Sequence, residues 1–161
     1  MTDFDIKRTR CCFTGHRPEK LICSEADTVS FLRREIASAV DDGYFVFISG
    51  MSRGVDIWAA EEVLRLRGDG AGVKLVCAVP FEGFEKQWSG DWQMRYHDIL
   101  AHADLNCLIS PEYTRSAYHD RNRWMVDRSA RLIAVYDGSP GGTRYTVEYA
   151  AKNGLDIHMM K

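Results

Sequence analysis

Short, continuous apolar runs alternate with longer amphipathic stretches along the whole chain. The run 44–48 is apolar throughout and rich in aromatic and β-branched residues, which predicts a strand buried on both faces. The stretch 25–41 follows Ser24, a good helix cap, and carries apolar residues at helical spacing. By the same criteria we expect further strands at 10–14, 73–79, 105–109, 132–136 and 155–158, and helices at 55–67, 91–103, 118–129 and 143–153. This alternation predicts a three-layer, Rossmann-like α/β domain with a mainly parallel sheet.

Length and charge limit the function classes. The 161 residues contain no repeat and no linker, so we expect 1–161 to form one domain. A formal net charge of −2 excludes a globally basic nucleic-acid coat. No apolar run approaches the roughly 18–20 residues of a membrane helix, and the first ten residues lack the apolar core of a signal peptide. We therefore expect a cytoplasmic protein without membrane contact.

The cysteines and histidines do not form a recognisable metal or disulfide pattern. None of the five cysteines forms a CxxC pair, and no two of the five histidines are four residues apart as in HExxH. Cys12, Cys77 and Cys107 lie in apolar runs, where we expect buried, reduced thiols. The sequence therefore predicts no metal site and no required cofactor.

Three predicted strands end in loops rich in glycine or hydroxyl residues, at 14–18, 49–56 and 137–146. The carboxyl ends of parallel strands are where such sheets bind ligands. Two of these loops run directly into a helix, whose free first-turn N–H groups and dipole favour an anion. The loops lack GxGxxG and GxxxxGK[ST], which argues against a typical NAD-dependent dehydrogenase and a P-loop NTPase. We expect them to converge on the phosphate of a small-molecule nucleotide ligand.

The candidate ligand-binding residues all come from these loops. They are Thr14, Gly15, His16, Arg17, Ser49, Gly50, Met51, Arg53, Gly54, Asp56, Gly141, Gly142, Thr143 and Thr146. Arg17 and Arg53 carry fork-shaped donors that suit phosphate oxygens. His16 has two interpretations, a phosphate donor or an exposed loop residue without a role. Asp56 also has two, an acceptor for a ribose hydroxyl or a carboxylate that offsets the helix dipole.

The loop sequences resemble a known superfamily. The string SGMSRGVD at 49–56, followed by two alanines at 59 and 60, is similar to the SGxARGID…A motif of the DprA/Smf family. TGHRP at 14–18, WAAE at 58–61, PF at 80–81, NRWMVD at 122–127 and YDG…GGT at 136–143 follow in the order of the YpsA-like branch of the SMF/DprA–LOG (SLOG) superfamily. The resemblance covers nearly the whole chain. It implies a Rossmann-like fold, often homo-oligomeric, that binds nucleotides or derivatives such as ADP-ribose, NAD or nucleoside monophosphates.

The same resemblance implies ligand-site roles for part of the candidate set. These roles carry over to Gly15, Arg17, Ser49, Gly50, Arg53, Gly54, Asp56, Gly142 and Thr143. An enzymatic alternative comes from the Lonely-guy branch, which cleaves the N-glycosidic bond of nucleoside monophosphates and has a PGGxGTxxE motif. Here 140–142 and Glu148 match that motif, but Arg144 and Tyr145 replace its second Gly–Thr pair. Glu148 is therefore either the catalytic carboxylate or an exposed helical residue.

Single-stranded DNA is a further candidate partner. The segment 113–131 contains Arg115, Arg121, Arg123, Arg128 and Arg131, interleaved with Tyr113, Tyr118 and Trp124 and with only two acids, Asp120 and Asp127. Cations with aromatic rings between them are typical of a groove for single-stranded nucleic acid. The alternative is a solvated helix face or an oligomer interface, where arginine and tryptophan are also common. The slightly negative net charge favours that alternative.

Overall fold

Six parallel strands form one sheet at the centre of the computed structural model, which describes residues 6–160. The strands are β1 (Arg10–Gly15), β2 (Val46–Ser49), β3 (Lys74–Phe81), β4 (Leu105–Ser110), β5 (Arg131–Val135) and β6 (Asp156–Met160). Their order across the sheet is β4-β3-β2-β1-β5-β6, and every neighbouring pair runs parallel. The expected three-layer α/β fold is confirmed, with a sheet that is wholly rather than mainly parallel.

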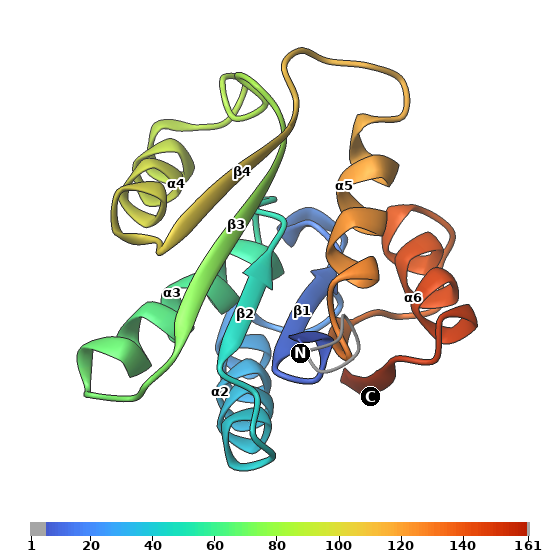
Figure 1. The fold of residues 1–161 in the computed structure, drawn as a ribbon. Helices are drawn as coiled ribbons and strands as arrows, with labels where there is room; N and C mark the ends of the chain where they lie inside the picture. Colours follow the sequence, from blue (N-terminus) through green and yellow to red (C-terminus); the bar gives the residue numbers. More distant parts are fainter. Residues whose placement is uncertain (1–5, 161) are drawn as a thin grey trace.

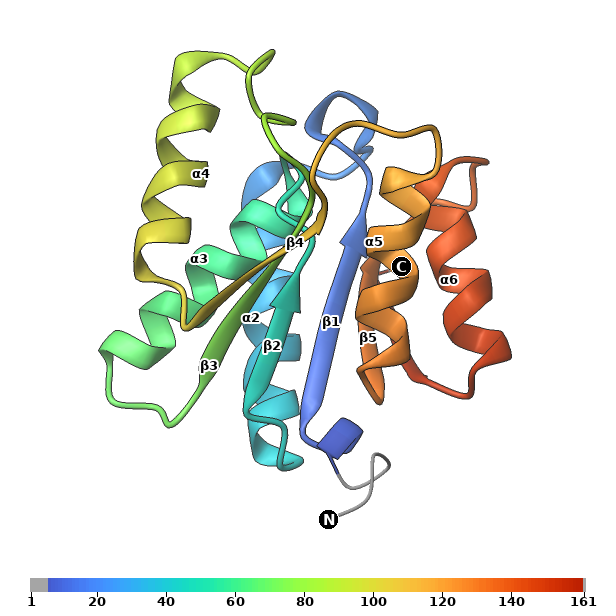
Figure 2. The same ribbon diagram turned by 45° about the horizontal axis from the view of Figure 1, so that its top comes forward.

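Helices cover both faces of the sheet, as Figures 1 and 2 show. The helices are α2 (Glu25–Asp41), α3 (Val55–Gly68), α4 (Gly90–His102), α5 (Ala117–Asp127) and α6 (Gly142–Lys152), with a short 3-10 helix, η1 (Pro18–Lys20). Buried side chains of α2, α3 and α4 share one core with Phe13 and Phe47 of the sheet. Those of α5 and α6 share a second core with Cys12 and Ile48. Because side chains alternate across a strand, neighbouring residues of β1 and of β2 enter opposite cores.

The strand order reverses at β1. From β1 the chain moves outward through β2 and β3 to the edge strand β4, and α5 then carries it back to β5 on the other side of β1. At the carboxyl edge Gly15 of β1 pairs with Val135 of β5. The loops that leave these two strands start side by side and run toward opposite faces, which opens a crevice between them.

Two details of the sequence prediction are wrong. Strand β2 starts at Val46 rather than Tyr44, because the pairing with β1 and β3 begins there. Phe45 precedes it and is 43% exposed, so the run is not buried on both faces throughout. Cys107 is only half-buried, because β4 has a neighbouring strand on one side only. Cys12 and Cys77 are buried as expected, and all five cysteines are free thiols.

Between residues 6 and 160, no helix has the length and apolar character to cross a membrane. The same residues contain no cluster of three or more His, Cys, Asp or Glu side chains that could hold a metal ion.

Candidate functional site: a pocket at the reversal of the sheet

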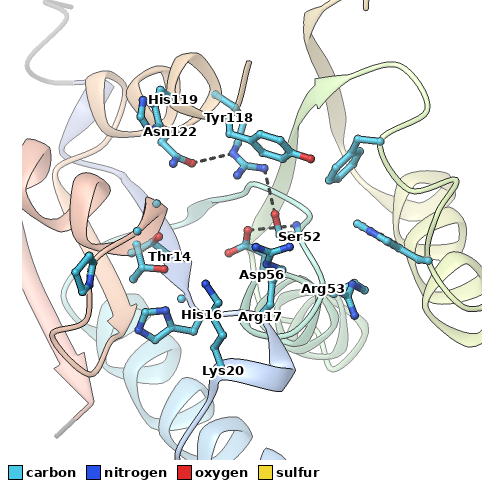
Figure 3. Close-up of a pocket in the computed structure, with 18 residues that line it drawn as sticks. Thr14, His16, Arg17, Lys20, Ser52, Arg53, Asp56, Tyr118, His119 and Asn122 are labelled. Atoms are coloured by element: carbon cyan, nitrogen blue, oxygen red, sulfur yellow. Dashed lines mark hydrogen bonds between the residues drawn. The ribbon is translucent and has the colours of Figure 1, made fainter. Parts of the chain in front are cut away.

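The loops that follow β1, β2 and β5 meet at one pocket of about 370 Å³ at the carboxyl edge of the sheet. The segment after β3 and the first turns of α5 complete its wall (Figure 3). Three glycine- and hydroxyl-rich loops that are far apart in the chain thus share one cavity. This convergence is the geometry that the sequence predicts.

The structure brings together nine of the candidate residues and leaves six outside the pocket. Those that line it are Thr14, Gly15, His16, Arg17, Arg53, Asp56, Gly141, Gly142 and Thr143. The others, Ser49, Gly50, Met51, Gly54, Thr146 and Glu148, do not line it. The Ser49 hydroxyl is fully buried, donates to the Asp56 carbonyl at 2.8 Å and accepts from the Met51 N–H, so it shapes the loop from within. The Thr146 hydroxyl donates to the Gly142 carbonyl inside α6.

Two glycines place α3 against the end of β1. A Cβ at Gly15 would stand 2.4 Å from Cγ2 of Val55, so only glycine permits this approach. Gly54 caps α3 with φ +90°, a backbone conformation that favours glycine, and a Cβ there would meet the Pro18 ring at 2.9 Å. Close packing against Val55 and Pro18 therefore explains both glycines. By contrast, a Cβ at Gly142 meets no protein atom within 4 Å, so the fold does not explain that glycine.

Asp56, in the first turn of α3, places a carboxyl group in the pocket wall. The residue is only 6% exposed, and its Oδ2 accepts a hydrogen bond from the Ser52 N–H at 3.3 Å. Its Oδ1 is buried without a hydrogen-bond partner among the described residues. Burial raises the pKa of Asp56 to about 6, although the charge of Arg121 and the Ser52 N–H oppose the shift. A buried acceptor without a partner is costly to the fold and available to a ligand.

Arg121 of α5 holds the β2–α3 loop from the opposite side. It is 5% exposed, and its Nη1 donates to the Gly50 carbonyl at 2.5 Å and to the Ser52 hydroxyl at 3.4 Å. Its Nε donates to Oδ1 of Asn122 at 2.9 Å. Burial lowers the pKa of Arg121, while the charge of Asp56 opposes that shift. Because arginine stays protonated in proteins, this guanidinium places positive charge beside the pocket, and its two bonds fix the turn that leads to Asp56.

The three remaining cations of the pocket differ in whether a carboxylate pairs with them. Arg17 is exposed, and its guanidinium makes no hydrogen bond or ion pair with the rest of residues 6–160. Lys20 at the end of η1 is also exposed and lines the pocket. Arg53 instead pairs with Glu19, Nη2 to Oε1 at 2.9 Å. Of the two arginines expected to hold phosphate, Arg17 is therefore the one without a carboxylate partner in the described part of the chain.

His16 is a buried residue, so the expectation that it could be an exposed loop side chain is wrong. It is 7% exposed, and its Nε2 lies 2.9 Å from Oδ1 of Asp137 in the loop after β5. The same carboxylate oxygen accepts from both the N–H and the hydroxyl of Ser139. These Ser139 bonds, followed by His16, lower the pKa of Asp137 to about 2. The contacts tie the end of β1 to the loop that leads into α6.

Two further predicted features lie elsewhere. Glu148 is exposed on α6, pairs with Arg144 at 3.0 Å and does not reach the pocket. The arginines of 113–131 do not form one face. Arg121 is buried at the pocket, whereas Arg131 is buried at the amino end of β5 and pairs with Asp42 at 2.8 Å.

Sequence reasoning missed half of the pocket wall. The missed residues are Lys20, Ser52, Phe84, Trp88, Tyr118, His119, Arg121, Asn122 and Pro140. The available signals were the NRWMVD string, which starts at Asn122, and the basic, aromatic run around it. Neither signal indicates that α5 crosses back over the sheet to this edge.

Comparison with known proteins agrees with this architecture. Two UPF0398 proteins, from Bacillus thuringiensis (strain Al Hakam) and Bacillus cereus (strain AH187), are each 35% identical over 151 residues, which is 88% of this chain and 82% of theirs. DNA processing protein A (DprA) from Streptococcus pneumoniae has a similar fold, with TM-score 0.68 and 16% identity over 94% of this chain. This chain spans half the length of that protein.

DprA from Helicobacter pylori, described with a single-stranded DNA binding mode, matches with TM-score 0.65 and 21% identity over 99% of this chain and 67% of its own. At such identities these two structures show the fold alone. The sequence itself matches the model of the YpsA family, described as the YspA SLOG family, over residues 11–161. The chain therefore belongs to the YspA SLOG family.

Proposed function

We propose that this protein binds a nucleotide or a nucleotide derivative in the pocket between the ends of β1, β2 and β5. The ligand is a small molecule with a phosphate group and free sugar hydroxyls. Binding, rather than hydrolysis, is the proposed activity, because Glu148, the carboxylate suggested for cleavage, lies outside the pocket.

The phosphate end of the ligand is assigned to the start of α6. This helix begins at Gly142, and its cap residue Gly141 makes no side-chain hydrogen bond to the first turn. Its first N–H groups are therefore without a side-chain cap beside the pocket, where the helix dipole also favours an anion. Arg17, which has no carboxylate partner among residues 6–160, adds a guanidinium on the same cavity. A ligand phosphate would accept hydrogen bonds both from these N–H groups and from the Arg17 guanidinium.

The hydroxyl end is assigned to Asp56. Its Oδ1 lacks a partner and is nine-tenths buried, so a ligand hydroxyl would supply the missing donor. Helix-dipole compensation, the other interpretation, does not require a carboxyl oxygen that is buried without a hydrogen bond. This unpartnered oxygen, on a residue that lines the cavity where α6 also begins without a side-chain cap, is the single observation that carries the proposal.

The test is a thermal-shift and calorimetry panel of AMP, ADP, ADP-ribose, NAD and cyclic nucleotides. At a ligand concentration 100-fold above Kd, binding adds about 2.7 kcal/mol to the stability, which raises the Tm of a chain of this size by roughly 5–10 °C. Loss of a charged hydrogen bond in Arg17→Ala should weaken the binding by roughly 10-fold or more. A panel in which no nucleotide changes the Tm or releases heat would refute the proposal.

A matched pair of glycine variants locates the site. Gly142 and Gly90 are each the first residue of a helix, both are exposed, and a Cβ at either meets no protein atom within 4 Å. Gly142→Ala should therefore fold normally and lose affinity, because the new methyl group occupies ligand space. Gly90 is outside the pocket, so Gly90→Ala should fold normally and keep the nucleotide affinity of the wild type. Equal affinities in the two variants would place the ligand elsewhere.

Single-stranded DNA is a second candidate, supported by the description of the Helicobacter pylori neighbour. The observation on this chain that favours it is a surface of stacked rings on α5 and α6, where His119 and Tyr145 are 4.1 Å apart and Arg123 lies 5.7 Å from the Tyr145 ring. A labelled oligonucleotide should then bind with an affinity that falls steeply as salt rises. Absent or salt-insensitive binding would exclude this candidate.

A further inference from the structure

A second hollow of about 670 Å³ lies beside the nucleotide pocket, at the carboxyl ends of β3 and β4. The segment between β3 and α4 and the segment between β4 and α5 contribute to its wall, and Figure 2 shows both at the same end of the sheet. We call it the aromatic groove, after six of the residues that line it: Phe81, Phe84, Trp88, Trp92, Tyr113 and Tyr118. The phosphate and hydroxyl contacts proposed above involve none of these rings.

The rings of the groove meet edge to face and hold one another in place. Tyr113 and Tyr118 meet the ring of Phe81 at centroid distances of 5.2 and 5.7 Å and interplanar angles of 79° and 86°. Trp88 meets Phe84 in the same way, at 5.0 Å and 77°. Tyr113 is 63% exposed and Tyr118 is 41% exposed. The groove therefore presents fixed aromatic ridges whose outer faces are free to contact a partner.

Four hydrogen-bond donors on these rings have no partner. The indole N–H groups of Trp88 and Trp92 and the hydroxyls of Tyr113 and Tyr118 make no hydrogen bond with any other of residues 6–160. A helix docked in the groove would cover these donors without pairing them, because its own carbonyls are bonded within the helix. A polyproline II segment has no internal hydrogen bonds, so its carbonyls are free to accept. The donors therefore favour an extended peptide.

The charge of the groove is positive. Arg17, Arg53 and Lys86 line it, and no Asp or Glu is among the described residues that do so. Arg53 is held by Glu19 at 2.9 Å, whereas the charged groups of Arg17 and Lys86 pair with no carboxylate in the described part of the chain. Two such cations complement a peptide with a few spaced carboxylates. A single-stranded nucleic acid carries a phosphate on every nucleotide and needs cations along its whole track.

We propose that the aromatic groove is a docking site for an acidic, proline-rich segment of a partner protein, bound in the polyproline II conformation. Proline rings pack on the exposed aromatic faces, and the segment's carbonyls accept from the four free donors. Its carboxylates pair with Lys86 and, in the absence of nucleotide, with Arg17. This conformation exists before binding, so docking costs little conformational entropy. The docking requires no nucleotide, so it stands or falls independently of the function proposed above.

The experiment titrates nucleotide-free protein into a fluorescein-labelled peptide of three Glu-Pro-Pro repeats and measures fluorescence polarisation. The probe should bind saturably. A Lys-Pro-Pro repeat peptide should bind at least about tenfold more weakly, because like charges then face each other. A Glu-Ala-Ala repeat peptide should also bind at least about tenfold more weakly, because it lacks the proline rings and the preformed conformation.

Two pairs of variants place the peptide in the groove. Lys86→Glu should weaken the Glu-Pro-Pro peptide and tighten the Lys-Pro-Pro peptide, whereas Lys152→Glu makes the same charge change on an exposed residue outside the groove and should alter neither. Tyr113→Ala should weaken the Glu-Pro-Pro peptide at least about fivefold. Tyr113 is exposed and lies outside the helices and strands, so this variant should keep the fold. Phe45→Ala removes an exposed ring outside the groove and should have no effect.

Three outcomes overturn the inference while leaving the nucleotide proposal intact. The first is no saturable binding of the Glu-Pro-Pro peptide at millimolar concentration. The second is equal binding of the three peptides, or binding that neither Lys86→Glu nor Tyr113→Ala changes. The third is an oligo(dT) strand that binds and is weakened by Tyr113→Ala while no peptide binds, which would make the groove a single-strand site.

Discussion

The buried carboxyl group of Asp56 should destabilise the protein at neutral pH. Its pKa is about 6 in the folded protein, raised mainly by burial, against 3.8 for an ordinary aspartate. Between these two values the folded state binds more protons than the unfolded state, so the free energy of unfolding falls as the pH rises. At 1.36 kcal/mol per unit, the full shift corresponds to about 3 kcal/mol, lost between roughly pH 4 and pH 7.

Asp56→Asn keeps the shape of the side chain and removes its titration. Urea unfolding of both proteins at half-unit steps from pH 4 to pH 8 would give the difference in unfolding free energy at each pH. The difference should move in favour of the variant by up to about 3 kcal/mol as the pH rises, and level off above pH 7. The variant's lost attraction to Arg121 reduces this gain. Nucleotide affinity should fall in the same variant, as expected for a site built at the expense of stability.

Asp137→Asn is the matched control, because the pKa shift of Asp137 has the opposite sign. The Ser139 and His16 hydrogen bonds lower its pKa to about 2, so its contribution is present above pH 4 and is lost only as the pH falls toward 2. The titration of the Asp137 carboxyl itself therefore adds no slope to the difference between this variant and the wild type from pH 5 to pH 8, and the double variant His16→Gln/Asp137→Asn, compared with His16→Gln, keeps the contact with His16 out of the comparison. If the Asp56→Asn difference does not change with pH, or moves in favour of the wild type with rising pH, the assignment of a buried carboxyl with a raised pKa is refuted.

Three further outcomes follow from the described contacts. Gly15→Ala should lower the free energy of unfolding by about 1–3 kcal/mol in urea titrations, since its Cβ would stand 2.4 Å from Val55, and adding Val55→Ala should recover part of the loss. Glu148→Ala should leave nucleotide affinity unchanged in calorimetry, because the side chain is exposed away from the pocket; a large loss would contradict the site. Cys23, which is half-exposed, should react with a thiol reagent at pH 8 in the native protein, whereas Cys77, whose pKa burial raises to about 12, should react only on unfolding; Cys23→Ser identifies the fast phase.

The sequence predicts the sheet and the shared edge of its loops, because both follow from local patterns. Strands apolar throughout require cover on both faces, and parallel strands bring their carboxyl ends to one edge. The strand limits are less predictable, as the exposed Phe45 shows, because pairing with two neighbours decides where β2 begins.

The distant half of the site could not be predicted in the same way. Arg121 looks like one cation in a basic run, and its burial depends on the Gly50 carbonyl, 71 positions earlier in the chain. The burial of His16 depends on Asp137, 121 positions later. Such partners depend on how α5 and α6 pack across the sheet. The spacing of residues within one segment does not predict that packing.

The position of β1 at the centre of the sheet has a consequence for synthesis on the ribosome. The pocket is walled by segments from near residue 14 to residue 143, so its first and last walls are translated almost the full chain apart. A nascent chain that has emerged only as far as β4 has the acidic wall at Asp56 but neither α5 nor the glycine turn before α6. The cavity is complete only when α5 and the turn before α6 are in place, so the proposed nucleotide would protect the finished protein and not folding intermediates that lack these segments.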